Sequence, residues 1–253
     1  MSDKVIIERH GATQVITINR MDARNAVDPE TAATLKAGFE QGEADAAVKV
    51  HILTGAGGHF CAGADLKAVA GKAGFEREGP MGPSWLDLKK PSIAAVEGHA
   101  VAGGLELAIL CDLRIASEVA VFGVYCRRWG VPLIDGGTVR LPRLIGQSRA
   151  MDMILTGRSV DAAEALSFGL ANRVVPQGES LKLALEMAEQ LAAFPQACMQ
   201  NDRASVLQQW SLSAGDALAF ENRIGQRSLR AGADTGAARF AGGKGRSGDF
   251  SNI

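Results

Sequence analysis

Short apolar runs that end at glycine recur along most of this chain, and they limit the folds that it can adopt. VKVHILTG and KPSIAAVEG each hold β-branched and small residues closed by a glycine, as expected for buried strands. A glycine-containing loop and a helical pattern follow, for example AGGHFCAGADL after the first run. Repeated strands, loops and helices predict an α/β protein with functional residues at the strand ends.

The two ends of the chain depart from this pattern. KVIIER and TQVITINR, separated by residues 10–12, predict a hairpin, and DPETAATLKAGFEQGEAD predicts a helix that begins at Asp-Pro. After GLANRVVP the sequence is rich in helix formers, with a break at Pro195. We therefore predict a core over residues 1–196 and a C-terminal helical region over residues 197–253.

Charge and segment composition argue against several classes of protein. The formal net charge is −1, which does not predict a nucleic-acid-binding surface. No run of about 18 apolar residues predicts a membrane helix, and MSDKVIIERH does not resemble a secretory signal. The four cysteines are widely spaced and form no CxxC pair. This spacing predicts a reduced, cytoplasmic protein without a structural zinc site.

Common nucleotide-binding, hydrolase and metal motifs are absent from the sequence. It contains no GxxxxGK[ST], GxSxG or HExxH, and GAGGHF lacks the third glycine of a dinucleotide fingerprint. His59 and His99 each stand beside a glycine-rich turn, where we expect structural roles. No metal site is predicted.

Two glycine-flanked turns are candidates for binding an oxyanion. Ala64 ends the turn in CAGADL, with Asp65 at a capping position, and Gly103 opens the helix in AGGLEL. Amides at helix N-termini lack intrahelical partners and attract negative charge. Two such amides aimed at one point would stabilise a thioester enolate, and Gly103-Gly104 would admit a carbonyl group. The alternative is that both are ordinary strand-to-helix turns.

One segment interrupts the regular alternation of strands and helices. AGKAGFEREGPMGPS, residues 70–84, mixes glycine, proline and charged residues. This composition is typical of a mobile loop, and we expect a lid or a partly disordered segment there.

Several of these segments together resemble the crotonase superfamily, the enoyl-CoA hydratase/isomerase family. HFCAGADL, VEGHAVAGGLELAILCDLRIAS, GGTVRLPRLIG and LTGRSVDAAEALSFGLANRVVP follow the order and spacing of that family. The resemblance implies a spiral of ββα units with C-terminal helices that build trimers, often paired into hexamers. It also implies acyl-CoA thioester substrates, with coenzyme A as part of the substrate and no separate cofactor.

The resemblance also assigns binding residues. The family's oxyanion hole falls on the amides of Ala64 and Gly103, and Arg24 would face a phosphate of coenzyme A. Trp129 and Tyr125 would either wall the acyl pocket or pack in the core. The substrate- and CoA-binding positions implied in this sequence are Ala23, Arg24, Ala62, Ala64, Asp65, Leu66, Lys67, Gly103, Gly104, Trp129 and Lys244.

The catalytic positions depart from the hydratase pattern. The first of the two family glutamates matches Glu106, which stands alone among apolar neighbours, whereas the second falls on Cys126. A thiol is a poor substitute for a carboxylate, and a small buried cysteine that fills space is the alternative. Asp135 is either a replacement acid/base or a cap for the helix that begins at Gly136.

These residues lead us to expect an enoyl-CoA hydratase that stabilises a thioester enolate. Because the second glutamate is missing, isomerisation, decarboxylation or C–C cleavage through the same enolate is the first alternative. A non-catalytic protein that binds acyl-CoA or RNA is the alternative from another class, although the sequence has no basic stripe.

Overall fold

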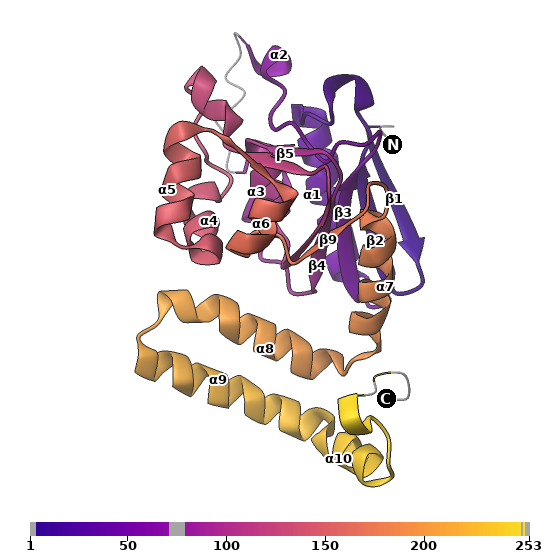
Figure 1. The fold of residues 1–253 in the computed structure, drawn as a ribbon. Helices are drawn as coiled ribbons and strands as arrows, with labels where there is room; N and C mark the ends of the chain where they lie inside the picture. The colour runs from indigo at the N-terminus through magenta and orange to yellow at the C-terminus, as the bar shows by residue number, and fades with distance from the viewer. Residues whose placement is uncertain (1–3, 71–78, 249, 251–253) are drawn as a thin grey trace.

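The computed structural model describes residues 4–70, 79–248 and 250, and its strands form two sheets (Figure 1). The strands are β1 (Val5–His10), β2 (Thr13–Ile18), β3 (Val50–Gly55), β4 (Ser92–Val96), β5 (His99–Val101), β6 (Leu113–Ser117), β7 (Val121–Gly123), β8 (Ser159–Asp161) and β9 (Arg173–Val175). The larger sheet has the order β1-β2-β3-β4-β6-β9, and the smaller one has the order β5-β7-β8.

The larger sheet begins as a hairpin and continues as a parallel sheet. Strands β1 and β2 pair antiparallel, whereas β2, β3, β4, β6 and β9 pair in parallel. Parallel neighbours need crossover connections, which the intervening helices and the smaller sheet supply. The predicted hairpin and the predicted strands over VKVHILTG and KPSIAAVEG are confirmed.

Ten α-helices are described within these residues, and most of them surround the sheets. They are α1 (Pro29–Ala44), α2 (Leu66–Val69), α3 (Gly103–Leu110), α4 (Gly137–Ile145), α5 (Gln147–Thr156), α6 (Ala162–Phe168), α7 (Ser180–Ala193), α8 (Gln196–Gln208), α9 (Ala214–Ser228) and α10 (Asp234–Ala241). Helix α1 begins as its sequence predicts. The Asp28 carboxylate accepts a hydrogen bond from the Thr31 amide at 2.8 Å, and Pro29 in the first turn has no N–H group that would lack an acceptor.

The two faces of the larger sheet are covered by separate hydrophobic clusters. On one face Val15, Ile52 and Ile115 pack against Ala184 and Ala188 of α7. On the other face the main core unites α1, α3, α4, α5 and α6 with the remaining strand side chains. All eight residues of α3 are buried, which agrees with its almost wholly apolar sequence. Side chains alternate across a strand, so a sheet covered on both faces needs apolar residues at successive positions.

The C-terminal helices form a layer apart from the α/β body. In Figure 1 α8 and α9 run side by side beneath the body, and α10 lies at one end of them. Helix α8 has no buried residue, and Ile224 is the one buried residue of α9. The expected α/β class with a helical C-terminal region is confirmed. Among the described residues no helix is long and apolar enough to span a membrane.

Residues 71–78 of the predicted loop lie outside the described residues. Its described end, residues 79–84, contains a turn and the start of the short helix η2 (Pro83–Trp85). Met81, Pro83 and Ser84 are buried there. This end of the segment therefore packs into the body of the protein.

Candidate active site

A cavity of about 360 Å³ opens where the turns before α2 and α3 meet η3 (Tyr125–Trp129) and the loop before α4. Its lining combines cations with apolar side chains and two carboxylates. The lining residues are Arg24, Ala62, Ala64, Leu66, Pro80, Met81, His99, Val101, Ala102, Gly103, Glu106, Tyr125, Cys126, Arg128, Trp129, Val131, Pro132, Ile134 and Asp135.

Glu106 is one of the two buried carboxylates that line this cavity. It lies in the first turn of α3 and is 2% exposed. Its Oε1 accepts the backbone amides of Asp135 at 2.9 Å and Gly137 at 2.8 Å. Burial raises the pKa of Glu106 to about 7, the amide of Gly137 opposes the rise, and the charge of Asp135 adds to it. The polar partner that a buried acid requires is thus the N-terminal end of α4.

The predicted oxyanion amides lie on neighbouring turns. Gly63 has a φ of +97°, and a β-carbon there would lie 3.0 Å from the Gly103 nitrogen. Ala64 follows directly, and both Ala64 and Gly103 line the cavity. Neither amide donates a hydrogen bond to a protein acceptor within the described part of the chain.

Ala102 places the Gly103 amide at the cost of backbone strain. It is the N-cap of α3 and has a φ of 54° and a ψ of −125°, which non-glycine residues rarely adopt. Its own amide donates to the Gly123 carbonyl at 2.8 Å, which holds the turn against the smaller sheet. The strained turn directs the α3 amides to the cavity.

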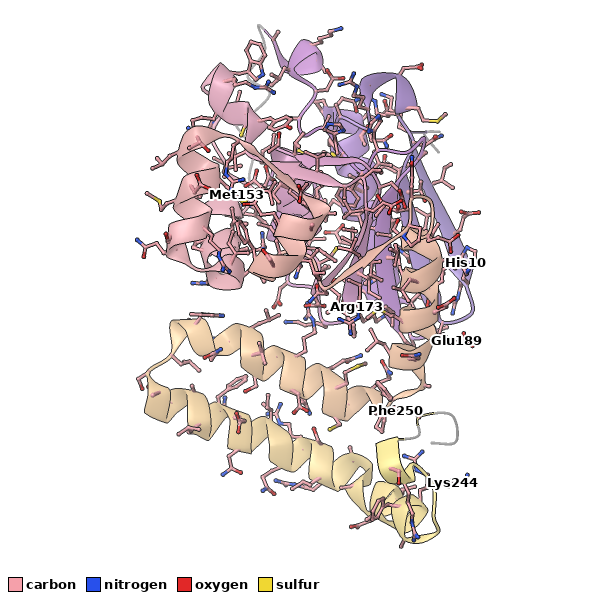
Figure 2. The ribbon with its side chains drawn as sticks, in the orientation of Figure 1. His10, Met153, Arg173, Glu189, Lys244 and Phe250 are labelled. Atoms are coloured by element: carbon pink, nitrogen blue, oxygen red, sulfur yellow. The ribbon has the colours of Figure 1, made fainter. Side chains whose placement is uncertain are left out.

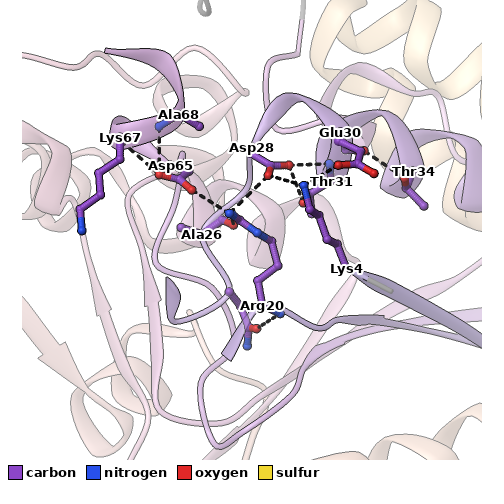
Figure 3. A network of polar contacts seen from close by, with 11 residues as sticks. Lys4, Arg20, Ala26, Asp28, Glu30, Thr31, Thr34, Asp65, Lys67 and Ala68 are labelled. Carbon is purple, nitrogen blue, oxygen red and sulfur yellow. Dashed lines mark hydrogen bonds and ion pairs between the residues drawn. The ribbon is translucent and has the colours of Figure 1, made fainter. Parts of the chain in front are cut away.

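An ion-pair network fixes the turn that carries Ala64. Asp65 caps α2 by accepting the amides of Lys67 and Ala68, and its other oxygen accepts Nη2 of Arg20 at 2.8 Å (Figure 3). The same Arg20 nitrogen lies 3.3 Å from Asp28. Burial opposes the change, but the hydrogen bond from Arg20 lowers the pKa of Asp65. The expected capping role of Asp65 is confirmed.

Asp135 does not cap α4, so that sequence-based alternative was wrong. The N-cap of α4 is Gly136, and no side chain bonds there. The Asp135 carboxylate instead points back to the loop after residue 78. Its Oδ1 accepts the Met81 amide at 3.0 Å and the Ser84 hydroxyl. Burial raises the pKa of Asp135, and the bonds from Ser84 and Met81 oppose that rise.

Cys126 lies in the same cavity as a neutral thiol. It is buried in η3, and burial together with the charge of Glu106 raises its pKa. The flanking arginines have other partners: Arg127 donates to the Ile154 carbonyl at 2.9 Å, and Arg128 lies over the Tyr125 ring. The charge of Arg127 opposes the rise in the pKa of Cys126 without outweighing burial. The structure therefore gives no support to an activated thiolate.

The positions implied for coenzyme A separate into two groups. Arg24, Ala62, Leu66 and Trp129 line the cavity, together with the two oxyanion residues. The residues outside the lining are Ala23, Asp65, Lys67, Gly104 and Lys244.

Two of the residues outside the lining have physical explanations. A β-carbon at Gly104 would overlap the Cys61 carbonyl, so this glycine allows α3 to pack closely rather than admitting a substrate. Lys244 lies beside α10 in the C-terminal region, away from the α/β body (Figure 2). In this copy of the chain Lys244 is therefore far from the cavity.

Several residues of the site were not predicted from the sequence, among them Met81 in the cavity lining and Arg140 next to it. Met81 lies beside the Gly103 turn, and Arg140 donates to the carbonyls of Asp135 at 2.8 Å and Ser84 at 2.7 Å. Only the glycine- and proline-rich composition of residues 79–84 marked this segment. Met81 and Asp135 are 54 residues apart in the chain, so no local sequence pattern could have paired these two loops.

The histidines near the cavity form a pair rather than a cluster. The Nδ1 atoms of His59 and His99 are 3.4 Å apart, and burial, His59 and Arg24 lower the pKa of His99. Among the described residues, no three side chains of histidine, cysteine, aspartate or glutamate gather in a way that could hold a metal ion.

Comparison with known proteins was made for the family, for individual relatives and for solved structures. The family model described as enoyl-CoA hydratase/isomerase matches residues 8–241. An enoyl-CoA hydratase of Mycobacterium tuberculosis is 39% identical over 229 residues, which cover 87% of this chain and 86% of that protein. A carnitinyl-CoA dehydratase of Salmonella typhi is 40% identical over 197 residues, 76% of this chain and 75% of that protein.

The solved structures agree over nearly the whole chain. The crystal structure of an enoyl-CoA hydratase from Mycobacterium tuberculosis has a TM-score of 0.90 at 35% identity, with 95% of this chain and 96% of that chain covered. The structure of a probable enoyl-CoA hydratase/isomerase from Mycobacterium abscessus has a TM-score of 0.87 at 40% identity, with the same two coverages, 95% and 96%.

Proposed function

Because this chain belongs to the enoyl-CoA hydratase/isomerase family, we propose that it adds water across the 2,3-double bond of a 2-trans-enoyl-CoA. The observation that carries the proposal is Glu106, a buried carboxylate in the cavity, one turn of α3 away from the Gly103 amide. Burial raises the pKa of this carboxyl to about 7, so it can both accept and donate a proton near neutral pH.

The two turns supply the electrostatic part of the reaction. Attack on the β-carbon moves negative charge to the thioester oxygen. The amides of Ala64 and Gly103 have no protein acceptor among the described residues, and in our proposal both donate to that oxygen. Coenzyme A enters as part of the substrate, and this charge stabilisation requires no metal ion or organic cofactor.

Glu106 carries the proton transfers in this proposal. Its carboxylate accepts a proton from water as the hydroxyl group bonds to the β-carbon, and the resulting carboxylic acid then protonates the α-carbon. The amides of Asp135 and Gly137 hold Oε1, which fixes the orientation of the carboxyl group. Cys126 stands at the position of the second family glutamate, but a buried neutral thiol cannot take that role.

Asp135, the second carboxylate of the cavity, makes another reaction through the same enolate the alternative to hydration. Isomerisation, decarboxylation or C–C cleavage through the same enolate would use Glu106 together with Asp135, which also lines the cavity. Incubation with enoyl- and malonyl-type CoA esters, followed by mass spectrometry, separates these reactions from hydration. Asp135→Asn keeps an oxygen that can accept the bonds of Met81 and Ser84. Hydration should then fall less than 10-fold, and a fall as large as that of Glu106→Gln would favour the carboxylate pair.

Binding without catalysis is the alternative that the relatives favour least, since they are named as enzymes. A salt-dependent shift with RNA that no CoA ester produces would support it. If the protein neither binds nor converts an acyl-CoA at millimolar concentration in the presence of EDTA, the proposal fails.

Assembly and location complete the proposal. Helices α8 and α9 and the short helix η4 (Gln209–Ser211) between them expose Val206, Leu207, Trp210 and Leu218, which supports a homotrimer or a hexamer of paired trimers. If Lys244 contacts coenzyme A, it must do so from a neighbouring copy, because it lies away from the cavity of its own chain. The four cysteines are free, which supports a cytoplasmic location.

A further inference from the structure

The wall of the cavity beside the Gly103 turn is hydrogen-bonded to the loop before α4. We define the clamped segment as residues 79–85. Within it, the Met81 amide and the Ser84 hydroxyl both donate to Oδ1 of Asp135, the amide at 3.0 Å. Ser84 is 1% exposed and Asp135 is 2% exposed, so water does not compete for these bonds. A buried polar group that is fully bonded holds its partners in one arrangement.

The side chains of Arg140 and Trp85 add hydrogen bonds between the clamped segment and the loop before α4. Arg140 donates through Nη2 to the Ser84 carbonyl at 2.7 Å and through Nη1 to the Asp135 carbonyl at 2.8 Å. The Trp85 indole donates to the Ile134 carbonyl at 3.1 Å. Four hydrogen bonds thus tie the clamped segment to one short loop or to the arginine that follows it, and a fifth ties that arginine to the loop. The wall is a fixed part of the body.

The clamp sets the position of Met81. This side chain is 1% exposed and lines the cavity. A β-carbon at Gly103 would lie 2.5 Å from the Met81 sulfur, so the thioether fills the space beside the oxyanion residue. Pro80, Val131, Pro132 and Ile134 continue this apolar side of the cavity.

We propose that Met81 is the residue that limits the acyl chain of the substrate, and that the clamp of Asp135, Ser84 and Arg140 is the positioning device that keeps it there. The inference rests on the proposed function. If the thioester oxygen binds the amides of Ala64 and Gly103 and the reacting carbons face Glu106, the chain beyond the β-carbon must pass Met81. A fixed wall beside the reacting carbons favours short, straight acyl chains over long ones.

The test measures binding, so that it does not depend on the reaction. Isothermal titration with butanoyl-CoA and octanoyl-CoA gives the ratio of the two dissociation constants for the wild type, Met81→Ala and the matched control Met153→Ala. Met153 is a fully buried methionine of α5 that does not line the cavity. We expect Met81→Ala to shift the ratio toward octanoyl-CoA by about 10-fold or more, the size that pocket methylenes confer. The control should leave the ratio unchanged.

Ser84→Ala tests the clamp without touching the cavity lining. Its control is Ser92→Ala, which removes another buried hydroxyl that donates to an aspartate, Asp112, at 3.2 Å. We expect Ser84→Ala to shift the ratio in the same direction by a smaller factor, and Ser92→Ala to leave it unchanged. If Met81→Ala does not fold, Met81→Val removes part of the same side chain.

Two failures are distinguishable. If neither ester binds the wild-type protein, the proposed function falls together with this inference. If both esters bind and the ratio stays within two-fold in Met81→Ala or Met81→Val, the acyl-CoA function stands and the role of Met81 is overturned.

Discussion

The α/β body and the C-terminal helices differ in how much of their apolar surface is buried within one chain. The body encloses its hydrophobic residues on both faces of the larger sheet, and even its acidic Glu106 is bonded inside. Helices α8 and α9 together bury one residue and expose large apolar side chains such as Leu218. Helices of this kind are not stabilised by their own packing alone. The body therefore buries its apolar surface within one chain, whereas the helical layer leaves large apolar side chains exposed.

Polar and aromatic contacts link the two regions, for example Arg143 of α4 over the Trp210 ring. Arg203 of α8 donates to the Asp112 carboxylate at 2.8 Å and to the Leu88 carbonyl. No residue of α8 is buried. The two regions can thus be perturbed separately, which makes the following predictions independent of one another.

The largest effect is expected inside the body, at the carboxylate. Glu106→Gln keeps an oxygen that can accept the amides of Asp135 and Gly137, but it cannot transfer a proton. Turnover of crotonyl-CoA should fall about 10²- to 10⁴-fold, whereas the dissociation constant of butanoyl-CoA should change little. Steady-state kinetics and isothermal titration measure the two quantities. A variant that retains more than a tenth of the wild-type turnover would remove Glu106 from the mechanism.

The second effect is on stability and depends on pH. Burial raises the pKa of Glu106 from 4.5 to about 7, so its contribution to folding is fully present below pH 4.5 and is lost as the pH rises through about 7. A change of this size corresponds to about 3 kcal/mol. As the pH rises from 4.5 to about 7, the wild type should lose this stabilisation, whereas Glu106→Gln, which does not titrate, should not. The free energy of unfolding of the variant should therefore increase relative to that of the wild type over this pH range.

Urea denaturation across this pH range measures the difference. The matched control is Glu189→Gln, because Glu189 is an exposed residue of α7 (Figure 2). Its difference from the wild type should not follow the same pH dependence. A constant difference for Glu106→Gln would contradict a raised pKa.

The third effect sharpens the contrast between the two regions. Leu218 on α9 is 67% exposed and Leu155 on α5 is 64% exposed, so the same change to glutamate tests equally exposed leucines. Leu218→Glu should raise the dissociation constant of the trimer or hexamer at least 10-fold, because a charge would be buried between copies. Leu155→Glu should leave the assembly intact.

Light scattering at micromolar concentration follows the assembly. A wild-type protein that is monomeric under these conditions would contradict the interpretation of the helical layer. If both variants dissociated equally, the assembly contact could not be assigned to α9.

The smallest effect is expected at the thiol. Cys126→Ala removes a neutral group from the cavity, and turnover of crotonyl-CoA should stay within about two-fold of the wild type. Circular dichroism gives a control for folding. If the loss equalled that of Glu106→Gln while Asp135→Asn had no effect, the thiol would take part in the chemistry.

The sequence alone determined the N-terminal hairpin, the first helix, the strands that end at glycine, the helical C-terminal region and the identity of the buried acid. Strand runs closed by glycine predicted β3 and β4, and Asp65 was predicted as a cap because its pattern is local. Glu106 was marked by its isolation in an apolar helix. Periodicity, capping and turn chemistry act over a few residues, so they can be recognised along the chain.

Only the tertiary structure decided what surrounds those residues. The amides that bond to Glu106 come from Asp135 and Gly137, residues 29 and 31 positions later in the chain. From the sequence, a helix cap was one of the two roles considered for Asp135. The bond between Met81 and Asp135 spans 54 positions, and Lys244 is far from the cavity in its own copy. Burial and the pairing of distant loops set the pKa of Glu106 and the wall of the cavity, because desolvation and hydrogen bonding depend on neighbours in space rather than in sequence.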